Sequence, residues 1–372
     1  MVKENSARRG KGLTRFGKKP LALLLVIMLL ATLAGCAKTE PKSEQASKTE
    51  EKQTAPIELK LAHFWPATHP AELELVQPWA KDIEKATNGR VKITSYPAET
   101  LLKATDVYDG VVKGIADIGI SCFAYSKGRF PVCEVFELPG ITYTSSKSAS
   151  KVAWEGIKQL NPKEVQDTKL LMVITTGPGD LYTKTPVKNL ADLKGMAIRA
   201  TGISAKTLQT MGANPVNMPQ SEAWEALSKG MVKGNLGPDE VLKGWKQAEV
   251  TKYITKAPFL YNTLFFVTMN KDKWNALDPE LQKAIEGVNQ KYFEQVAMGL
   301  WDKQNADALK WAVDEKGMQV INLSEAEANK WKETVMPIQK EYIDYANKQG
   351  LKGGEIVATV KALADQYNQQ YK

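Results

Sequence analysis

Apolar and polar positions alternate along the chain in two rhythms, which predict strands and helices in turn. The segment IELKLAHF at 57–64 has the period of two that predicts a strand. After a proline-containing turn, AELELVQPWAKDIEKAT at 71–87 places its apolar residues at helical spacing. Asn88-Gly89 then predicts a turn into RVKITSYP at 90–97, a second strand. This regular alternation predicts α/β layers with mostly parallel sheets.

The alternation continues to about residue 278 and then changes. Further strands are predicted for ADIGISC, KLLMVITT, MAIRA, PVNMP, MVKGNLG, VTKYITKAP and NTLFFVTMN. Beyond Asp278, which can cap a helix that Pro279 opens, the pattern is nearly all helical, and Ser324 to Glu327 match a capping box. Two rounds of α/β without a clean linker predict two lobes through which the chain passes more than once. The site is expected in the cleft between them, at the carboxyl ends of strands.

The first 35 residues predict an export signal. Residues 1–19 carry seven basic side chains against one acidic, and 20–34 read PLALLLVIMLLATLA without a charge. This run has 15 residues, whereas a membrane-spanning helix needs about 20. It ends in Leu33-Ala34-Gly35-Cys36, which resembles the lipobox of bacterial lipoproteins. We therefore expect a lipoprotein signal peptide at 1–35 and a lipid, such as palmitate, on Cys36; an uncleaved anchor and a free cysteine after an ordinary signal are the alternatives.

The net charge of the whole chain, +8, lies mostly in this signal. Without residues 1–35 the formal charge falls to +2, so the initial suggestion of a nucleic-acid partner loses its support. Residues 36–56 contain AKTEPKSEQASKTEEKQTAP, which has no large apolar side chain to bury. This segment is expected to be a polar tether between the lipid anchor and the globular part.

Few residues could support catalysis or hold a metal. The three cysteines, Cys36, Cys122 and Cys133, share no metal-finger spacing. The two histidines, His63 and His69, lack the further ligands that zinc requires. No nucleophile elbow, zincin motif or calcium loop is present, so we expect neither an enzyme, nor a metal, nor a cofactor. Cys122 and Cys133 are either bridged or two buried thiols, and the sequence leaves both options open.

Arg199 is the strongest candidate for binding an anion. It stands at the end of the predicted strand MAIRA, and Thr201 begins the turn that follows. A guanidinium is always charged and matches a carboxylate with two parallel hydrogen bonds. The helix expected next adds free backbone amides that also favour an anion. The alternative is a structural ion pair with an acid such as Asp192.

Side chains that follow two other predicted strands are expected to reach the same cleft. Phe64 and Trp65 come directly after the first strand, and their aromatic groups could hold an organic ligand. Ser121 ends the strand ADIGISC, and Tyr125 lies just beyond it. The tryptophans of the predicted helices are interpreted as core and interlobe packing, with Trp245 as the exception.

The chain from about Ile57 to Tyr345 resembles the solute-binding proteins of tripartite ATP-independent periplasmic (TRAP) transporters, the DctP-like group. Six segments in family order carry this resemblance. They are TNGRVKITSYPAETL (87–101), VVKGIADIGIS (111–121), FELPG (136–140), TPVKNLADLKGMAIRA (185–200), MGANPVNMPQSEAWEALSKGMVKG (211–234) and TMNKDKWNAL (268–277).

The resemblance implies an α/β, two-lobed, periplasmic-binding-protein-like fold with discontinuous lobes, mixed sheets and a helical C-terminal part. The expected lobes are 57–176 with about 266–305, and 177–265 with about 306–372. In this family, lobes joined by crossing strands and a long helix close over an organic acid and deliver it to membrane subunits. The arginine of the family's DLKG-x-x-x-R motif, which matches Arg199, pairs with the ligand carboxylate.

Three departures from the family pattern bear on the ligand. Lys233 stands where an Asp is frequent, Gly237 replaces the Asn that often precedes the proline, and GPGDLYTKTP lacks the polar partners of members that bind dicarboxylates or sialic acid. With aromatic groups at Phe64, Trp65, Tyr125, Tyr182 and Tyr261, a monocarboxylate is favoured, such as a 2-oxo, hydroxy or aromatic acid. The expected ligand-binding residues are Arg199, Phe64, Trp65, Ser121, Tyr125, Tyr182, Thr201, Gly237 and Glu240.

The expected protein is therefore an extracytoplasmic, lipid-anchored receptor. Its expected partners are a small organic acid, the TRAP membrane permease subunits, and the membrane through the lipid anchor. One alternative is an extracytoplasmic enzyme that uses Glu240 or Asp239 as an acid or base on a carboxylated substrate. Another is a sensory receptor with the same fold that signals to a membrane kinase.

Overall fold

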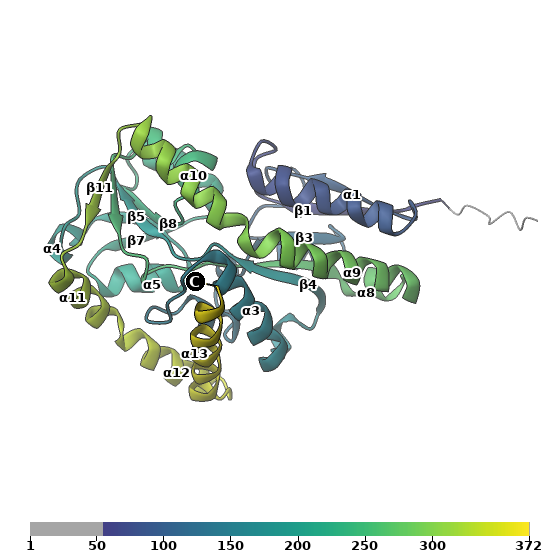
Figure 1. The fold of residues 1–372 in the computed structure, drawn as a ribbon. Helices are drawn as coiled ribbons and strands as arrows, with labels where there is room; N and C mark the ends of the chain where they lie inside the picture. Colours follow the sequence, from purple (N-terminus) through teal and green to yellow (C-terminus); the bar gives the residue numbers. More distant parts are fainter. Residues whose placement is uncertain (1–54, 372) are drawn as a thin grey trace, which may run out of the picture. The chain divides into compact units, whose positions relative to one another are not determined.

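The computed structural model describes residues 55–371, shown in Figure 1. The predicted signal peptide (1–35), the lipidation site Cys36 and nearly all of the tether (36–56) lie outside the described residues. From Ile57 to Asp278 strands and helices mostly alternate as the sequence pattern predicts, but the strands Asp180–Thr183 and Leu264–Asn270 each follow another strand with no helix between them. None of the helices in 55–371 combines the length and the continuous apolar sequence needed to cross a membrane.

The first sheet has five strands in the order β2-β1-β3-β10-β4. Its strands are β1 (Ile57–His63), β2 (Val91–Tyr96), β3 (Ile118–Cys122), β4 (Thr168–Thr175) and β10 (Leu264–Asn270). Strand β1 pairs in parallel with β2 and β3, and β10 runs antiparallel between β3 and β4. All seven residues of β10, LFFVTMN, are buried because the strand lies inside the sheet.

The second sheet has six strands in the order β11-β9-β5-β8-β6-β7. Its strands are β5 (Asp180–Thr183), β6 (Ala197–Ala200), β7 (Asn214–Asn217), β8 (Gly234–Gly237), β9 (Tyr253–Lys256) and β11 (Gln319–Asn322). Strand β6 is parallel to β7 and β8, and β9 is parallel to β11, whereas β5 is antiparallel to both of its neighbours. Both sheets are thus mixed, and the expected two-lobed α/β fold is confirmed.

Two crossings of the chain between the sheets explain the antiparallel pairs. The chain leaves the first sheet after β4 to form β5, and it returns after β9 to form β10. Because the two crossings run in opposite directions, β4 is antiparallel to β10 and β5 is antiparallel to β9. A third connection between the two lobes runs through two successive helices (Figure 1). Helix α9 (Pro279–Gln295) contacts α1 (Gln77–Ala86) and β4. Helix α10 (Leu300–Asp314) contacts α7 (Val241–Gly244).

The remaining helices cover the sheets and form the C-terminal part. The other α-helices are α2 (Val107–Val112), α3 (Ser146–Leu160), α4 (Leu190–Leu193), α5 (Gly202–Thr210), α6 (Gln220–Ser228), α8 (Lys271–Asn275), α11 (Glu325–Val335), α12 (Pro337–Lys348) and α13 (Gly353–Gln370). Segment η1 (Ala71–Val76) is a π-helix. The short 3₁₀ helices are η2 (Phe123–Tyr125), η3 (Cys133–Glu137), η4 (Lys163–Val165), η5 (Gln247–Glu249) and η6 (Ala297–Gly299). Helix α13, in the segment expected to belong to the second lobe (about 306–372), packs against α3, in the segment expected to belong to the first (57–176) (Figure 1).

The predicted helix caps are found in the structure. The side chain of Asp278 accepts a hydrogen bond from Leu281 N at 2.9 Å, and α9 begins at Pro279. Ser324 caps α11 by accepting from Glu327 N at 3.2 Å, but the predicted capping box is not completed, because Glu327 Oε1 accepts from Leu190 N and Trp331 Nε1 and not from Ser324 N. The region after 278 was expected to be nearly all helical, and β11 is the exception: four residues that form an edge strand beside β9 are too short to set a recognisable period.

Candidate functional site

A cavity lies between the two sheets, where the carboxyl ends of several strands meet. It holds about 360 Å³ of space that no atom fills, counting its opening to solvent. Only about 30 Å³ of it is open to the centre of a water-sized sphere, which is room for roughly two water molecules, so the cavity is narrow in this structure. The first sheet contributes residues that follow β1 and β3, the second contributes residues in or after β6 and β8, and the crossing segments contribute Thr176, Tyr261 and Thr263.

Arg199 in β6 points its guanidinium into this cavity and is only 3% exposed. Its Nε donates to the carbonyl of Met218 at 3.0 Å. Its Nη1 donates to the side-chain oxygens of Gln220 at 3.1 Å and Asn235 at 3.3 Å, and its Nη2 donates to the hydroxyl of Tyr125 at 3.4 Å. Every one of these partners is neutral, so the positive charge has polar neighbours but no opposite charge.

The predicted alternative, a structural ion pair between Arg199 and Asp192, is wrong. The Asp192 carboxylate accepts hydrogen bonds from the backbone N–H groups of Lys188 and Asn189, where it completes the capping box of α4. Within residues 55–371, Arg199 forms no ion pair at all. A buried charge without an opposite charge beside it is costly, and an anion bound here would remove that cost, so Arg199 is a candidate for binding an anion.

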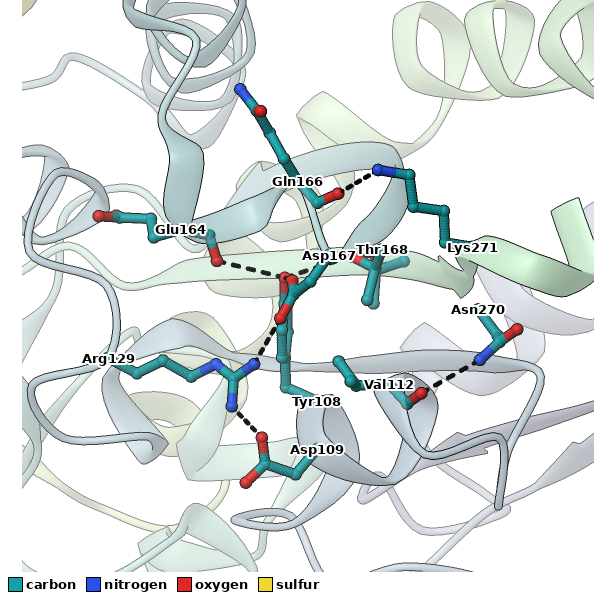
Figure 2. A network of polar contacts seen from close by, with 11 residues as sticks. Tyr108, Asp109, Val112, Arg129, Glu164, Gln166, Asp167, Thr168, Asn270 and Lys271 are labelled. Carbon is teal, nitrogen blue, oxygen red and sulfur yellow. Dashed lines mark hydrogen bonds and ion pairs between the residues drawn. The ribbon is translucent and has the colours of Figure 1, made fainter. Parts of the chain in front are cut away.

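Arg129 provides a contrast, because it lies beyond the same strand as Tyr125 but is fully compensated. Figure 2 shows its guanidinium between the carboxylates of Asp109 and Asp167, the latter at 2.7 Å. It also lies over the ring of Tyr108, 4.5 Å from the ring centre. This arginine serves the first lobe's structure, and the guanidinium available to a ligand is that of Arg199.

Aromatic side chains form one wall of the cavity. Trp65 stacks on Phe265 with 5.5 Å between ring centres, and Phe265 stacks on Trp301 at 5.1 Å. Phe64 stacks on Trp245 at 6.0 Å, which joins the loop after β1 to the segment after α7. These rings present flat apolar surfaces that suit the body of an organic acid, and an aromatic pair adds about 0.5 to 1.5 kcal/mol beyond buried area.

Two polar groups, Tyr125 and Gln220, flank Arg199 in the cavity. Burial, reinforced by Cys122, raises the pKa of Tyr125 well above its usual value against the opposing effect of Arg199, so the hydroxyl keeps its proton. Gln220, at the start of α6, is 7% exposed. Its Nε2 is buried and has no hydrogen-bond partner within the described residues. Among the described residues, the site therefore contains an amide N–H donor without an acceptor, next to a guanidinium without an opposite charge.

The two histidines are both buried in pairs with glutamates. His63 bonds Glu72 through Nε2 at 2.8 Å, and neither residue lines the cavity. His69 bonds Glu240, which lines the cavity. No group of three or more histidine, cysteine, aspartate or glutamate side chains that could hold a metal ion occurs in residues 55–371.

The structure brings most of the predicted ligand-binding residues to the cavity. Those that line it are Phe64, Trp65, Tyr125, Arg199, Thr201 and Glu240, together with the aromatic candidate Tyr261. Ser121, Tyr182 and Gly237 do not line it. Side chains alternate along a strand, so in β3 Cys122 faces the cavity while Ser121 donates to the carbonyl of Ala104 at 2.7 Å. The Tyr182 hydroxyl instead donates to Gly237 O at 3.0 Å.

Several lining residues were not predicted from the sequence. Gln220 follows a proline at the start of a helix, a position with no chemical signal of its own. Phe265 and Trp301 lie in β10 and α10, far along the chain from the other aromatics. The question of a Cys122–Cys133 bridge is also answered, because both are buried free thiols, and burial raises the pKa of each.

Comparison with known proteins agrees with this geometry. Residues 61–345 match the family model DctP, described as bacterial extracellular solute-binding protein, family 7. A TRAP periplasmic solute-binding protein from Desulfovibrio salexigens, solved in an open complex, is 35% identical with a TM-score of 0.74. The match covers 86% of this chain and 98% of that one.

Two further solved structures carry aromatic acids. A TRAP solute-binding protein from an unidentified marine microbe, specific for aromatic acid ligands and bound to 3-hydroxybenzoate, is 33% identical with a TM-score of 0.80, over 84% of this chain and 99% of that one. A TRAP solute-binding protein from Rhodoferax ferrireducens, with copurified benzoate, is 28% identical with a TM-score of 0.80, over 85% of this chain and all of that one (100%). The chain belongs to the DctP family of bacterial extracellular solute-binding proteins.

Proposed function

We propose that the protein is the solute-binding subunit of a TRAP transporter and captures an organic monocarboxylate between its two lobes. The observation that carries this proposal is the buried guanidinium of Arg199, which has only neutral partners within residues 55–371. A ligand carboxylate would supply the missing charge through paired hydrogen bonds. The unused amide of Gln220 would donate a further bond.

The aromatic wall narrows the ligand class. Rings of Trp65, Phe265 and Trp301 would cover the apolar body of the acid, which favours an aromatic acid over a short 2-oxo or hydroxy acid. The aromatic acids held by two of the similar proteins support this choice. Residues from both sheets line one cavity, so the ligand would contact both lobes and favour their closure.

Titration calorimetry with benzoate, phenylacetate and their hydroxylated derivatives tests the proposal. At least one acid should bind, and Arg199→Met should weaken that binding about hundredfold or more, because two charge-assisted hydrogen bonds are lost. Arg129→Met is the matched control: it should lower the melting temperature and leave the dissociation constant unchanged. Equal binding by the Arg199 variant would refute the anchor, and chemical conversion of the bound acid would favour the enzyme alternative.

The anchoring of the protein forms a separate part of the proposal. We infer that residues 1–35 are removed on export, that Cys36 becomes lipidated, and that 36–56 tether the binding unit outside the cytoplasm beside the permease subunits. Labelled palmitate should be incorporated into the wild-type protein and not into Cys36→Ser. A protein that is released into the soluble fraction with or without Cys36 would contradict the anchor and leave the ligand-binding proposal intact.

A further inference from the structure

A second charged side chain lines the cavity that contains Arg199. Glu240 directly precedes α7, is 4% exposed, and belongs to the cavity lining. Its Oε1 is bonded to His69, while its Oε2 has no hydrogen-bond partner in the described part of the chain. Arg199 and Glu240 do not pair with each other among these residues, so the cavity holds a separate cation and a separate carboxylate.

The hydrogen bonds of His69 define its protonation state. Its Nδ1 accepts from the backbone N–H of Ala71 at 3.1 Å, and a ring nitrogen that accepts carries no proton. The ring proton is then on Nε2, which donates it to Glu240. In this arrangement His69 is a neutral hydrogen-bond donor. It fixes the direction of the Glu240 carboxylate and supplies no positive charge to compensate it.

The surroundings fix this pair in place. The ring of His69 stacks on Trp65 with 6.1 Å between centres and lies 5.5 Å from the ring of Trp245. Gly244 packs so closely that a Cβ there would come within 2.8 Å of His69 Nε2 and even closer to Glu240 Oε1. Because His69 follows β1 of the first sheet and Glu240 follows β8 of the second, the pair also joins the two lobes beside the ligand cavity.

We propose that Glu240, positioned by His69, selects the ligand: an acid with one carboxylate and, elsewhere on the molecule, a hydrogen-bond donor such as a hydroxyl or an N–H group. This inference rests on the proposed function, in which Arg199 takes the carboxylate. The free Oε2 of Glu240 accepts the bond from the donor. A second carboxylate at that place would face a like charge in a cavity with little water, so dicarboxylates are excluded.

Two matched series of acids test this selection by titration calorimetry. The first is phenylacetate, mandelate, phenylglycine and phenylmalonate, which differ only in the group on one carbon. The second is benzoate, 3-hydroxybenzoate, 3-aminobenzoate and benzene-1,3-dicarboxylate. In at least one series the wild-type protein should bind a donor-bearing acid about tenfold tighter than the parent acid, and both dicarboxylates should bind weaker than their parents.

Glu240→Gln keeps the shape of the side chain and removes its charge. The dissociation constant of each dicarboxylate, divided by that of its parent acid, should fall about tenfold in this variant relative to the wild-type protein. Glu240→Asp keeps the charge on a shorter side chain, so it should still exclude dicarboxylates but lose the preference for the donor. Melting temperatures and circular dichroism of each variant establish that it is folded.

The outcomes separate this inference from the proposed function. If a dicarboxylate binds the wild-type protein as tightly as its parent, or if Glu240→Gln leaves the ratio unchanged, Glu240 does not select the ligand. The proposed function then still holds, provided that binding of the parent acid depends on Arg199. If no acid of either series binds, both proposals fail.

Discussion

The hydroxyl oxygen of Tyr125 lies 3.0 Å from the backbone nitrogen of Gln220 and accepts its hydrogen bond. Tyr125 follows β3 of the first sheet, and Gln220 opens α6 of the second lobe. The same oxygen accepts from Nη2 of Arg199 at 3.4 Å. One hydroxyl thus bridges the two lobes at the cavity and orients the guanidinium that the ligand would meet.

Tyr125→Phe should weaken binding of an aromatic acid about tenfold, since the two hydrogen bonds made by the hydroxyl are lost at the anion-binding end. The loss of an interlobe bond should also shift the ligand-free protein towards an open form. Calorimetry measures the first effect, and the radius of gyration from small-angle X-ray scattering measures the second. Unchanged values for both would contradict the bridging role.

Tyr108→Phe serves as the control for this substitution. Tyr108 is also buried, and it donates to Asp167 at 2.6 Å, but it lies in the network of Figure 2 rather than in the cavity lining. Its hydroxyl should contribute about 1 to 3 kcal/mol to the free energy of unfolding. The affinity for the acid should not change.

Gln220→Glu should give Arg199 an internal counter-ion. The side-chain oxygen of Gln220 already lies 3.1 Å from Nη1 of Arg199, so a carboxylate there would occupy the place of the ligand's negative charge. We expect the affinity for an organic acid to fall about hundredfold and the melting temperature of the ligand-free protein to rise. Gln220→Leu, which removes the donor without adding charge, should cost about tenfold in affinity. Thermal unfolding and calorimetry together check both variants, and unaltered binding by Gln220→Glu would contradict the arrangement.

The sequence predicted those parts of the fold and cavity that rest on local pattern. Most strands and helices follow from apolar periodicity, and Arg199, Phe64 and Trp65 were identified because each lies at the end of a predicted strand. Side-chain direction within a strand was not resolved, which is why Ser121 was chosen and its neighbour Cys122 faces the cavity. A shift of one residue reverses the face, and a fully buried strand shows no alternation to reveal it.

The lining residues that the sequence did not predict depend on long-range packing. Trp301 reaches the cavity only because α10 continues from α9 across to the second lobe. Gln220 becomes important because its amide is buried beside Arg199, and burial is a property of the assembled fold. Likewise, β5 has four residues and was not predicted, since its pairing with β8 and β9 is set by the crossing of the chain.

Gly179→Ala should destabilise the protein by about 1 to 3 kcal/mol, the usual effect of overpacking. Gly179 lies in the crossing segment between β4 and β5, where a Cβ would come within 2.6 Å of the carbonyl carbon of Gly237. That neighbour is backbone and cannot turn aside. Gly287→Ala is the control: nothing lies within 4 Å of its Cβ position in α9, so the protein should gain about 0.5 to 1 kcal/mol of helix stability. Urea denaturation measures both, and a stable Gly179 variant would contradict the close packing.

The stability of the protein should fall as the pH rises from 5 to 8, and Glu137 should account for part of this. Burial raises the pKa of Glu137 to about 8, although a hydrogen bond from the backbone N–H of Leu264 acts in the opposite direction. Burial and the nearby Glu164 also raise the pKa of Glu134 to about 7. Both residues lie in η3, so the folded conformation of this segment favours the protonated, uncharged form of the two carboxyl groups.

At pH values between the ordinary pKa of 4.5 and the raised pKa of about 8, the folded protein holds the Glu137 proton and the unfolded chain has released it. Folding takes up a proton in this window, so its free energy becomes less favourable with each step in pH, and the full loss is reached above pH 8. Glu137→Gln keeps an acceptor for Leu264 N and cannot ionise, so its free energy of unfolding should depend less on pH. The shift sets an upper limit of about 5 kcal/mol on the difference. Urea denaturation at pH 5, 6, 7 and 8 measures it, and parallel curves for the two proteins would show that Glu137 is ionised in the folded state throughout.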